Sequence, residues 1–269
     1  MFFLSLRLLY IRPEINTNMN TLILIPARYA STRFPGKPVA VLGDKTVIQH
    51  VVEAAEKFTE YTYVATDDSA IFDRVLSFGG KAIMTSEFHR SGTDRCREAM
   101  RKVVRNYGEK YFDVVVNLQG DEPFANPEDI ARLADSFSDS NVDIATLAKR
   151  FDRTEDVTDP NKVKVVTDMG GNALYFSRSP IPYFRGKEKA DWLESADYYK
   201  HIGMYAYRPH ILEAIADLPA GKLETVESLE QLRWLENGYR IAVRYTEHES
   251  VGIDSPEDLI RAEKILKMN

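Results

Sequence analysis

From residue 21 onward the chain alternates short apolar segments with longer segments of helical periodicity, and this alternation limits the folds open to it. The predicted strands are Thr21–Pro26, Thr62–Thr66, Lys81–Met84, Asp113–Leu118 and Asp143–Ala148. Between them, apolar residues recur at helical spacing in Val47–Phe58, Ser69–Phe78, Thr93–Tyr107 and Pro127–Phe137. Strands rich in valine, isoleucine and leucine, each followed by a helix, predict an α/β fold with a mostly parallel central sheet and helices on both faces. Ligands of such sheets bind beyond the carboxyl ends of the strands, so the residues just after each strand are candidates for a site.

The second half of the chain departs from this alternation and predicts a β-rich lobe embedded in the same fold. Lys162–Thr167 and Ala173–Ser177 have the pattern of a hairpin around the turn-rich segment Asp168–Asn172. Two prolines in Ser179–Pro182 make a helix there unfavourable. The remaining predicted elements are a strand at Tyr198–Tyr207, a helix at Val226–Glu236, a strand at Ile241–Tyr245 and a helix at Pro256–Lys267.

Charge and cysteine content exclude several classes of protein. The 35 lysines and arginines are outnumbered by 41 aspartates and glutamates, giving a net charge of −6. A nucleic-acid-binding domain is normally net basic, so we expect no nucleic-acid partner. The single cysteine, Cys96, excludes a disulfide within the chain and a cysteine-rich zinc site. We interpret it as a small buried apolar residue.

The first 18 residues differ from the rest of the chain. Their apolar stretch of 11 residues is interrupted by Arg7 and is too short to span a membrane. Met19 stands directly before the first predicted strand. We therefore expect residues 1–18 to be a disordered prefix or a misplaced start, and residues 19–269 to form a single domain without a membrane partner. A weak membrane anchor is the alternative for the prefix.

The loop after the first strand carries a concentration of positive charge. No acidic residue occurs between Asn16 and Gly43, whereas Arg28, Arg33 and Lys37 contribute three positive charges. Arginine and lysine neutralise phosphate oxygens, and hydroxyl and backbone N–H groups can hydrogen-bond to them. The loop is therefore a candidate anion site. A solvated basic loop is the alternative, and the spacing does not match a P-loop.

Two aspartates are candidates for a metal site. Asp121 follows the predicted strand Asp113–Leu118, and Asp254 precedes Ser255, which with Asp258 has the spacing of a helix capping box. Carboxylate oxygens suit Mg²⁺, which usually takes one or two of them and leaves its other positions to phosphate and water. The alternative for both aspartates is a structural turn.

A third segment, His89–Arg95, opens the predicted helix at Thr93–Tyr107. Ser91 and Asp94 have capping spacing, so helix capping alone accounts for the pattern. The functional alternative is a contact to a nucleobase or ribose at the start of the helix.

Taken together, five motifs in order resemble the 3-deoxy-manno-octulosonate cytidylyltransferase family, over residues 19 to about 267. They are PARYASTRFPGKP (Pro26–Pro38), HRSGTDR (His89–Arg95), NLQGDEP (Asn117–Pro123), YFSR (Tyr175–Arg178) and GIDSPEDL (Gly252–Leu259). The resemblance implies a nucleotide-diphospho-sugar transferase fold and transfer of CMP from CTP to 3-deoxy-D-manno-octulosonate (Kdo), with release of diphosphate. It also implies Mg²⁺ as cofactor, a homodimer, a cytoplasmic location and a role in lipopolysaccharide synthesis.

The resemblance also assigns roles to residues of this sequence. It implies catalytic roles for Lys37, Arg28 and Asp121, and metal ligation by Asp121 and Asp254. The implied nucleotide contacts are Arg28, Ser31, Arg33, Lys37, Ser91, Gly92 and Arg95. The implied sugar contacts are Gln119, Arg178, His201, Tyr205, Glu230 and Gln231. From its own surroundings, His201 is equally interpretable as a core histidine on a strand.

Other functions remain open at this level. A cytidylyltransferase for sialic acid or for an amino analogue of Kdo would carry similar motifs. A nucleotide-sensing protein without turnover would bind CTP only, and the presence of Lys37, Asp121 and Asp254 argues against it. A glycosyltransferase is not supported, because the chain contains no Asp-x-Asp motif.

Overall fold

The computed structural model describes residues 19–30, 33–249 and 251–268. The expectations for residues 1–18 and for Ser31 lie outside these ranges. Among the helices of the described residues, none combines the length and apolar character needed to cross a membrane.

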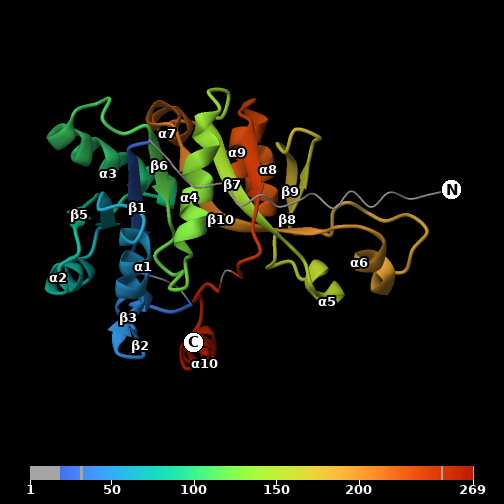
Figure 1. Ribbon diagram of the computed structural model, residues 1–269, viewed down its shortest axis with the longest axis horizontal. Coiled ribbons are helices and arrows are strands. Elements are labelled where there is room, and N and C mark those ends of the chain that lie inside the picture. The colour runs from blue at the N-terminus through green and yellow to red at the C-terminus, as the bar shows by residue number, and fades with distance from the viewer. Residues whose placement is uncertain (1–18, 31–32, 250, 269) are drawn as a thin grey trace.

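A nine-stranded sheet forms the centre of the fold, with strands in the order β11-β7-β10-β6-β1-β4-β5 and the β8–β9 hairpin attached to β10 (Figure 1). The strands are β1 (Thr21–Ala27), β4 (Thr62–Thr66), β5 (Ala82–Met84), β6 (Val114–Asn117), β7 (Ile144–Arg150), β8 (Lys164–Thr167), β9 (Ala173–Ser177), β10 (Tyr199–Tyr207) and β11 (Ile241–Tyr245). Among the described strands along the main path, β10 alone runs antiparallel to its neighbours. The predicted mostly parallel α/β sheet and the predicted hairpin are therefore confirmed.

Helices cover both faces of this sheet. They are α1 (Val47–Glu56), α2 (Ser69–Ser77), α3 (Gly92–Tyr107), α4 (Pro127–Asp135), α5 (Thr154–Val157), α6 (Trp192–Ser195), α7 (Pro209–Ala216), α8 (Lys222–Glu227), α9 (Gln231–Glu236) and α10 (Pro256–Leu266). Short 3-10 turns occur at η1 (Lys37–Val39), η2 (Ser136–Ser138) and η3 (Lys189–Asp191), and a small separate hairpin pairs β2 (Val41–Leu42) with β3 (Lys45–Thr46). Figure 1 shows β5 toward one end of the molecule and α5 and α6 toward the other.

The alternation of side chains along β1 divides the core between the two faces. Leu22 and Leu24 pack with α3, α7 and α9, whereas Ile23 and Ile25 pack with α1, α2 and α4. All four side chains are completely buried. A large aliphatic side chain contributes about 1.5–3 kcal/mol when it is fully buried, so this strand anchors both layers. Its carboxyl end therefore holds the loop that begins at Arg28 on a rigid base.

The predicted single helix at Val226–Glu236 is wrong: the segment forms α8 and α9, separated at Ser228. Ser228 has a left-handed backbone with φ of 52°. Glu227 accepts hydrogen bonds from the Ser177 hydroxyl (2.6 Å) and the Arg178 amide (2.9 Å), which hold the end of α8 against β9. The break leaves Val226 exposed while Leu232 is buried in the core, so tertiary contacts override the helical spacing.

The C-terminal helix begins at the capping box that the sequence predicts. Ser255 accepts a hydrogen bond from the Asp258 amide, and the Asp258 carboxylate accepts one from the Ser255 amide. Just before it, Ile253 is completely buried with Leu42, in a cluster that also holds Ala262 of α10. The Ile253 amide donates to the Asp121 carbonyl oxygen at 2.9 Å. The loop before α10 is thereby joined to the loop after β6.

We predict that Ile253→Ala lowers the free energy of unfolding by about 2–5 kcal/mol, because it leaves a cavity where three elements meet. Urea denaturation followed by circular dichroism measures the change. Ile260→Ala is the matched control, since Ile260 lies on α10 but is 55% exposed, and its effect is expected within about 0.5 kcal/mol. Equal effects of the two substitutions would contradict the prediction.

Candidate active site

A cavity of about 290 Å³ opens where β1 and β6 end, as expected for a sheet of this kind. Nine residues assigned to the site from the sequence line it: Arg28, Arg33, Lys37, Ser91, Gly92, Arg95, Gln119, Asp121 and Asp254. Pro26, Ala27, Pro38, His89, Arg90 and Gly120 complete the lining. Residues as far apart in the chain as Pro26 and Asp254 are thus brought to one cavity by the topology of the sheet.

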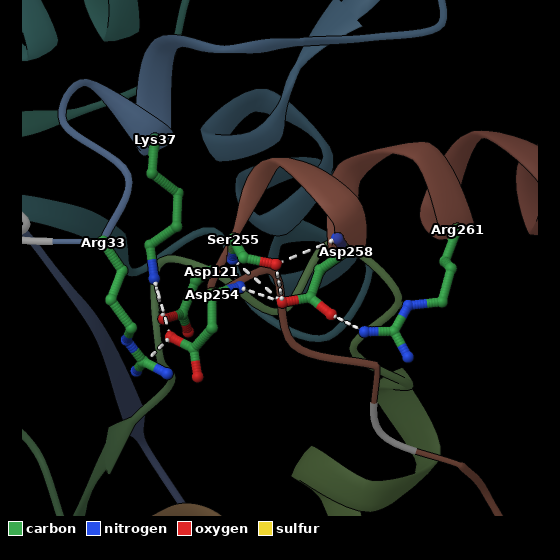
Figure 2. Close-up of polar contacts among 7 residues, drawn as sticks. All are labelled: Arg33, Lys37, Asp121, Asp254, Ser255, Asp258 and Arg261. Atoms are coloured by element: carbon green, nitrogen blue, oxygen red, sulfur yellow. Dashed lines mark hydrogen bonds and ion pairs between the residues drawn. The ribbon is translucent and has the colours of Figure 1, made fainter.

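Lys37 is the centre of the charged groups in this cavity (Figure 2). Its Nζ lies 2.5 Å from an Asp121 carboxylate oxygen and 3.3 Å from an Asp254 carboxylate oxygen. The same Asp254 oxygen lies 3.0 Å from an Arg33 guanidinium nitrogen. The Lys37 and Asp121 side chains are 12% and 29% exposed, so their contact is shielded from water more than an ordinary surface ion pair, whereas Arg33 and Asp254 are exposed.

The backbone positions both carboxylates. Asp121 follows Gly120, where a Cβ atom would come within 2.9 Å of the Pro26 carbonyl oxygen, so glycine allows the loop to approach β1 this closely. Asp254 is held from the other side, because its amide donates to the Asp258 carboxylate at 3.0 Å. Its own carboxylate is left to point toward Lys37 and Arg33 (Figure 2). Because Ser255 caps α10, the Asp254 side chain is not used for capping and lines the cavity.

Positive charge exceeds negative charge around the cavity. Five lysine and arginine side chains line it, against the two aspartates. Arg28 and Arg90 are exposed, and no hydrogen bond or ion pair links either of them to another described residue. Uncompensated guanidinium groups at the rim of a cavity favour an anionic ligand.

Sequence reasoning missed Arg90 and left His89 unassigned, although both lie in the HRSGTDR motif. The signal was their position immediately before Ser91, which caps α3 by accepting a hydrogen bond from the Asp94 amide at 3.1 Å. The capping interpretation of Ser91 is therefore confirmed, and Ser91 also lines the cavity. Ser91 can cap the helix and also contact a ligand, because the start of α3 itself lines the cavity.

Arg95 reaches the cavity from the first turn of α3 and is buried. Its guanidinium donates to the Thr85 hydroxyl at 2.6 Å and to the Asp67 carboxylate at 2.7 Å. These two partners follow β5 and β4, respectively. The ion pair compensates a buried charge that would otherwise be costly.

The predicted sugar contacts are divided between the cavity and the layer beside it. Gln119 lines the cavity and donates to the Asn117 side chain at 3.1 Å. Glu230 accepts a hydrogen bond from the Thr93 hydroxyl at 2.9 Å, next to the cavity-lining Gly92. Burial raises the pKa of Glu230. The Tyr205 hydroxyl and the Gln231 amide nitrogen are buried and have no hydrogen-bond partner among the described residues.

His201 and Arg178 do not line the cavity. His201 lies 2.9 Å from the Thr146 hydroxyl, and burial lowers its pKa to about 3, so the imidazole is neutral at physiological pH. The Arg178 guanidinium donates to the carbonyl oxygens of Glu227, Ser228 and Pro160. In this structure Arg178 fixes the junction between α8 and α9, and its contact to sugar stays a prediction.

Asp121 and Asp254 are the acidic residues that could hold a metal ion here. Within the described ranges, no cluster of three or more histidine, cysteine, aspartate or glutamate side chains has the arrangement of a metal site. Two carboxylates nevertheless suit Mg²⁺, which commonly binds through one or two of them together with substrate phosphates. One carboxylate oxygen of each aspartate contacts the same cationic nitrogen, Lys37 Nζ. The two carboxylates therefore converge on a position that favours a positively charged group.

Comparison with known proteins assigns the family. A family model described as cytidylyltransferase matches residues 22–241. The chain belongs to the 3-deoxy-manno-octulosonate cytidylyltransferase family.

Relatives of that name are similar to this chain over most of their length. The protein from Phocaeicola vulgatus is 55% identical over 247 residues, covering 91% of this chain and 96% of the relative. The protein from Parabacteroides distasonis is 54% identical over 243 residues, covering 89% and 95%, respectively. A solved structure of CMP:2-keto-3-deoxy-manno-octonic acid synthetase in complex with CTP has a TM-score of 0.84 at 40% identity, covering 93% of this chain and 99% of that one.

A more distant neighbour shows the fold alone. A thymidylyltransferase structure from Bacillus anthracis has a TM-score of 0.62 at 16% identity and covers 91% of this chain. The expected nucleotide-diphospho-sugar transferase fold is confirmed by these similarities.

We predict that Glu98, which supports one wall of the cavity, makes stability depend on pH. Burial alone would raise its pKa, but hydrogen bonds from Lys102, the Ser86 amide and His89 outweigh burial and lower the pKa to about 2. Because the folded pKa lies below the unfolded value of 4.5, the contribution is fully present above pH 4.5 and disappears as the pH falls toward 2.

Accordingly, Glu98→Gln is expected to lower the free energy of unfolding by about 2–3 kcal/mol at pH 7 and by roughly half as much at pH 3. Denaturation curves at pH 7, 5, 4 and 3 measure the difference from wild type. Glu109→Gln, at an exposed glutamate just after α3, serves as control and is expected to have little effect at any of these pH values. A pH-independent effect of Glu98→Gln would contradict the prediction.

Proposed function

We propose that this protein is a nucleotidyltransferase that transfers CMP from CTP to 3-deoxy-D-manno-octulosonate, forming CMP-Kdo and releasing diphosphate for lipopolysaccharide synthesis. The observation that carries the proposal is the cavity in which Lys37 joins Asp121 and Asp254, in a chain of this family. Support comes from relatives of that name that are more than 50% identical and from the similar structure solved with CTP.

The basic loop after β1 supplies the groups for the triphosphate. Lys37 is nearly buried and fixed by two carboxylates, while Arg28 and Arg33 are exposed beside it. When the Kdo anomeric hydroxyl attacks the α-phosphorus of CTP, a new P–O bond forms and the bond to the bridging oxygen of the diphosphate breaks. Negative charge then grows on the leaving diphosphate, and Lys37 and Arg28 would stabilise it.

Asp121 and Asp254 are the residues that would hold Mg²⁺ in this proposal. When bound, Mg²⁺ would neutralise phosphate charge and lower the pKa of a coordinated hydroxyl. The two carboxylates would then exchange part of their contact with Lys37 for the metal. Lys37 would in turn be free to contact the phosphates. A separate general base is not required by this arrangement.

The sugar acid would lie toward Gln119 and the layer of Glu230, Gln231 and Tyr205. In this region the Tyr205 hydroxyl and the Gln231 amide nitrogen are buried without a hydrogen-bond partner among the described residues, and hydroxyl groups of a sugar could satisfy them. His201, being neutral, would act as a hydrogen-bonding group and not as a cation toward the sugar carboxylate.

We further propose that residues 19–269 act as one cytidylyltransferase domain and that the protein is a cytoplasmic homodimer. The family match covers residues 22–241, and α10 packs against the β2–β3 hairpin through Leu42 and Ala262. Light scattering after size exclusion measures the oligomeric state, with the mass of two chains as the expected result.

The first functional test concerns the charged centre. Lys37→Ala and Asp121→Asn are each expected to remove about 2–4 kcal/mol of transition-state stabilisation, measured as the fall in kcat/KM for CTP. Lys45→Ala is the matched control, because Lys45 forms an ion pair with Glu53 on a half-exposed surface away from the cavity. Near-normal turnover of either site variant, with the fold intact, would refute the assignment.

The second test concerns substrate and metal. Diphosphate release is measured with CTP and a panel of Kdo, its amino analogue and sialic acid. Kdo is expected to give the highest kcat/KM, and removal of divalent cations by EDTA is expected to abolish turnover until Mg²⁺ is restored. A preference for another sugar acid would reassign the substrate while leaving cytidylyl transfer intact.

A further inference from the structure

Arg95 differs from the other cations of the cavity because its charge is already balanced. Its side chain is only 5% exposed, and the Asp67 carboxylate lies 2.7 Å from its guanidinium. Arg28 and Arg90, by contrast, are exposed and have no ion pair within the described chain. A neutral ion pair offers hydrogen-bond donors of fixed direction but little net charge. It is therefore suited to an uncharged part of a nucleotide and not to its phosphates.

The partners of Arg95 fix the orientation of the guanidinium plane. One terminal nitrogen donates to the Thr85 hydroxyl at 2.6 Å and to the Ser86 carbonyl oxygen at 3.4 Å. The other donates to the Asp67 carboxylate. A guanidinium carries five N–H groups, so these three bonds leave the Nε–H and one terminal N–H without an acceptor among the described residues. Arg95 also lines the cavity, and we infer that these two remaining donors face the ligand space.

Two neighbouring donors distinguish the pyrimidine bases. Cytosine presents two adjacent acceptors, its O2 and N3 atoms, whereas uracil presents O2 and an N3–H donor. A fixed donor fork satisfies both acceptors of cytosine but places a donor against the N3–H of uracil. A site built to hydrogen-bond one substrate rejects an analogue that leaves its buried polar groups unpaired.

We propose that Asp67 is a positioning residue that holds Arg95 as the reader of the base, and thereby sets the preference for CTP over UTP. This inference rests on the proposed function and names the group that selects its nucleotide. Asp67 directly follows β4, whose register against β1 fixes it rigidly beside the cavity. Asp67 itself does not line the cavity and acts through Arg95.

The test is a competition between CTP and UTP in one reaction with Kdo. The CMP-sugar and UMP-sugar products are quantified by mass spectrometry. Asp67→Ala is expected to lower the ratio of CMP-sugar to UMP-sugar at least about tenfold, since it removes a charged hydrogen bond. KM for CTP is expected to rise more than kcat falls. Asp67→Asn keeps one acceptor and should lower the ratio less, by about threefold or more. It provides the test if Asp67→Ala does not fold.

Glu213→Ala is the matched control. Glu213 of α7 forms an ion pair with Arg101, with an N–O distance of 2.8 Å. Arg101 lies on α3, as Arg95 does, but it does not line the cavity. Its product ratio is expected to equal that of wild type. A merely structural role of Asp67 would reduce both products equally and leave the ratio unchanged, and that result would overturn the inference. If the wild-type protein forms no CMP-sugar from CTP, the proposed function itself fails, which is a distinct outcome.

Discussion

The contact of one lysine with two aspartates is the constraint on which the site depends. Lys37 meets Asp121, 84 residues later, and Asp254, 217 residues later. Lys37 begins the 3-10 turn η1 after β1, Asp121 lies on the loop after β6, and Asp254 lies on the loop before α10. Each of these segments begins at, or packs against, a rigid helix or strand. The three side chains are therefore held close to one another by the fold. The lysine offsets the repulsion between the two neighbouring carboxylates and so allows them to lie close together.

Around this centre, the cavity separates two kinds of positive charge. Arg28, Arg33 and Arg90 are exposed at the rim, where an anionic ligand gains most from them. Arg95 is buried, paired with Asp67 and held in a single orientation. In the proposed function, the first kind would supply charge for phosphates, and the second would supply direction for a base. A net charge of −6 therefore does not exclude an anionic ligand, because the distribution of a few cations matters more than the net charge of the whole chain.

The strands and helices that follow from local periodicity agree closely with the structure, and the exceptions have physical causes. The segment at Val226–Glu236 has regular apolar spacing but breaks at Ser228, because Ser177, the last residue of β9, and Arg178, which follows it, hold Glu227. No local pattern in the segment contains that information. In the site, Arg90 was missed because its neighbour Ser91 accounts for the motif by capping alone. Asp67 was missed because an aspartate after a strand is also an ordinary turn and cap residue.

The sequence by itself determined the α/β class, the parallel strands and the basic loop, because each depends on neighbours within about a dozen residues. It also carried the five motifs that indicate the family. Only the tertiary structure decided which of these groups meet. The order of the strands brings Asp121 and Asp254 into contact with the same nitrogen, Lys37 Nζ. The fold also directs Arg178 to carbonyl oxygens at the α8–α9 junction, outside the cavity. Burial and pairing likewise decide charge, since His201 is neutral and Arg95 is compensated only in the folded chain.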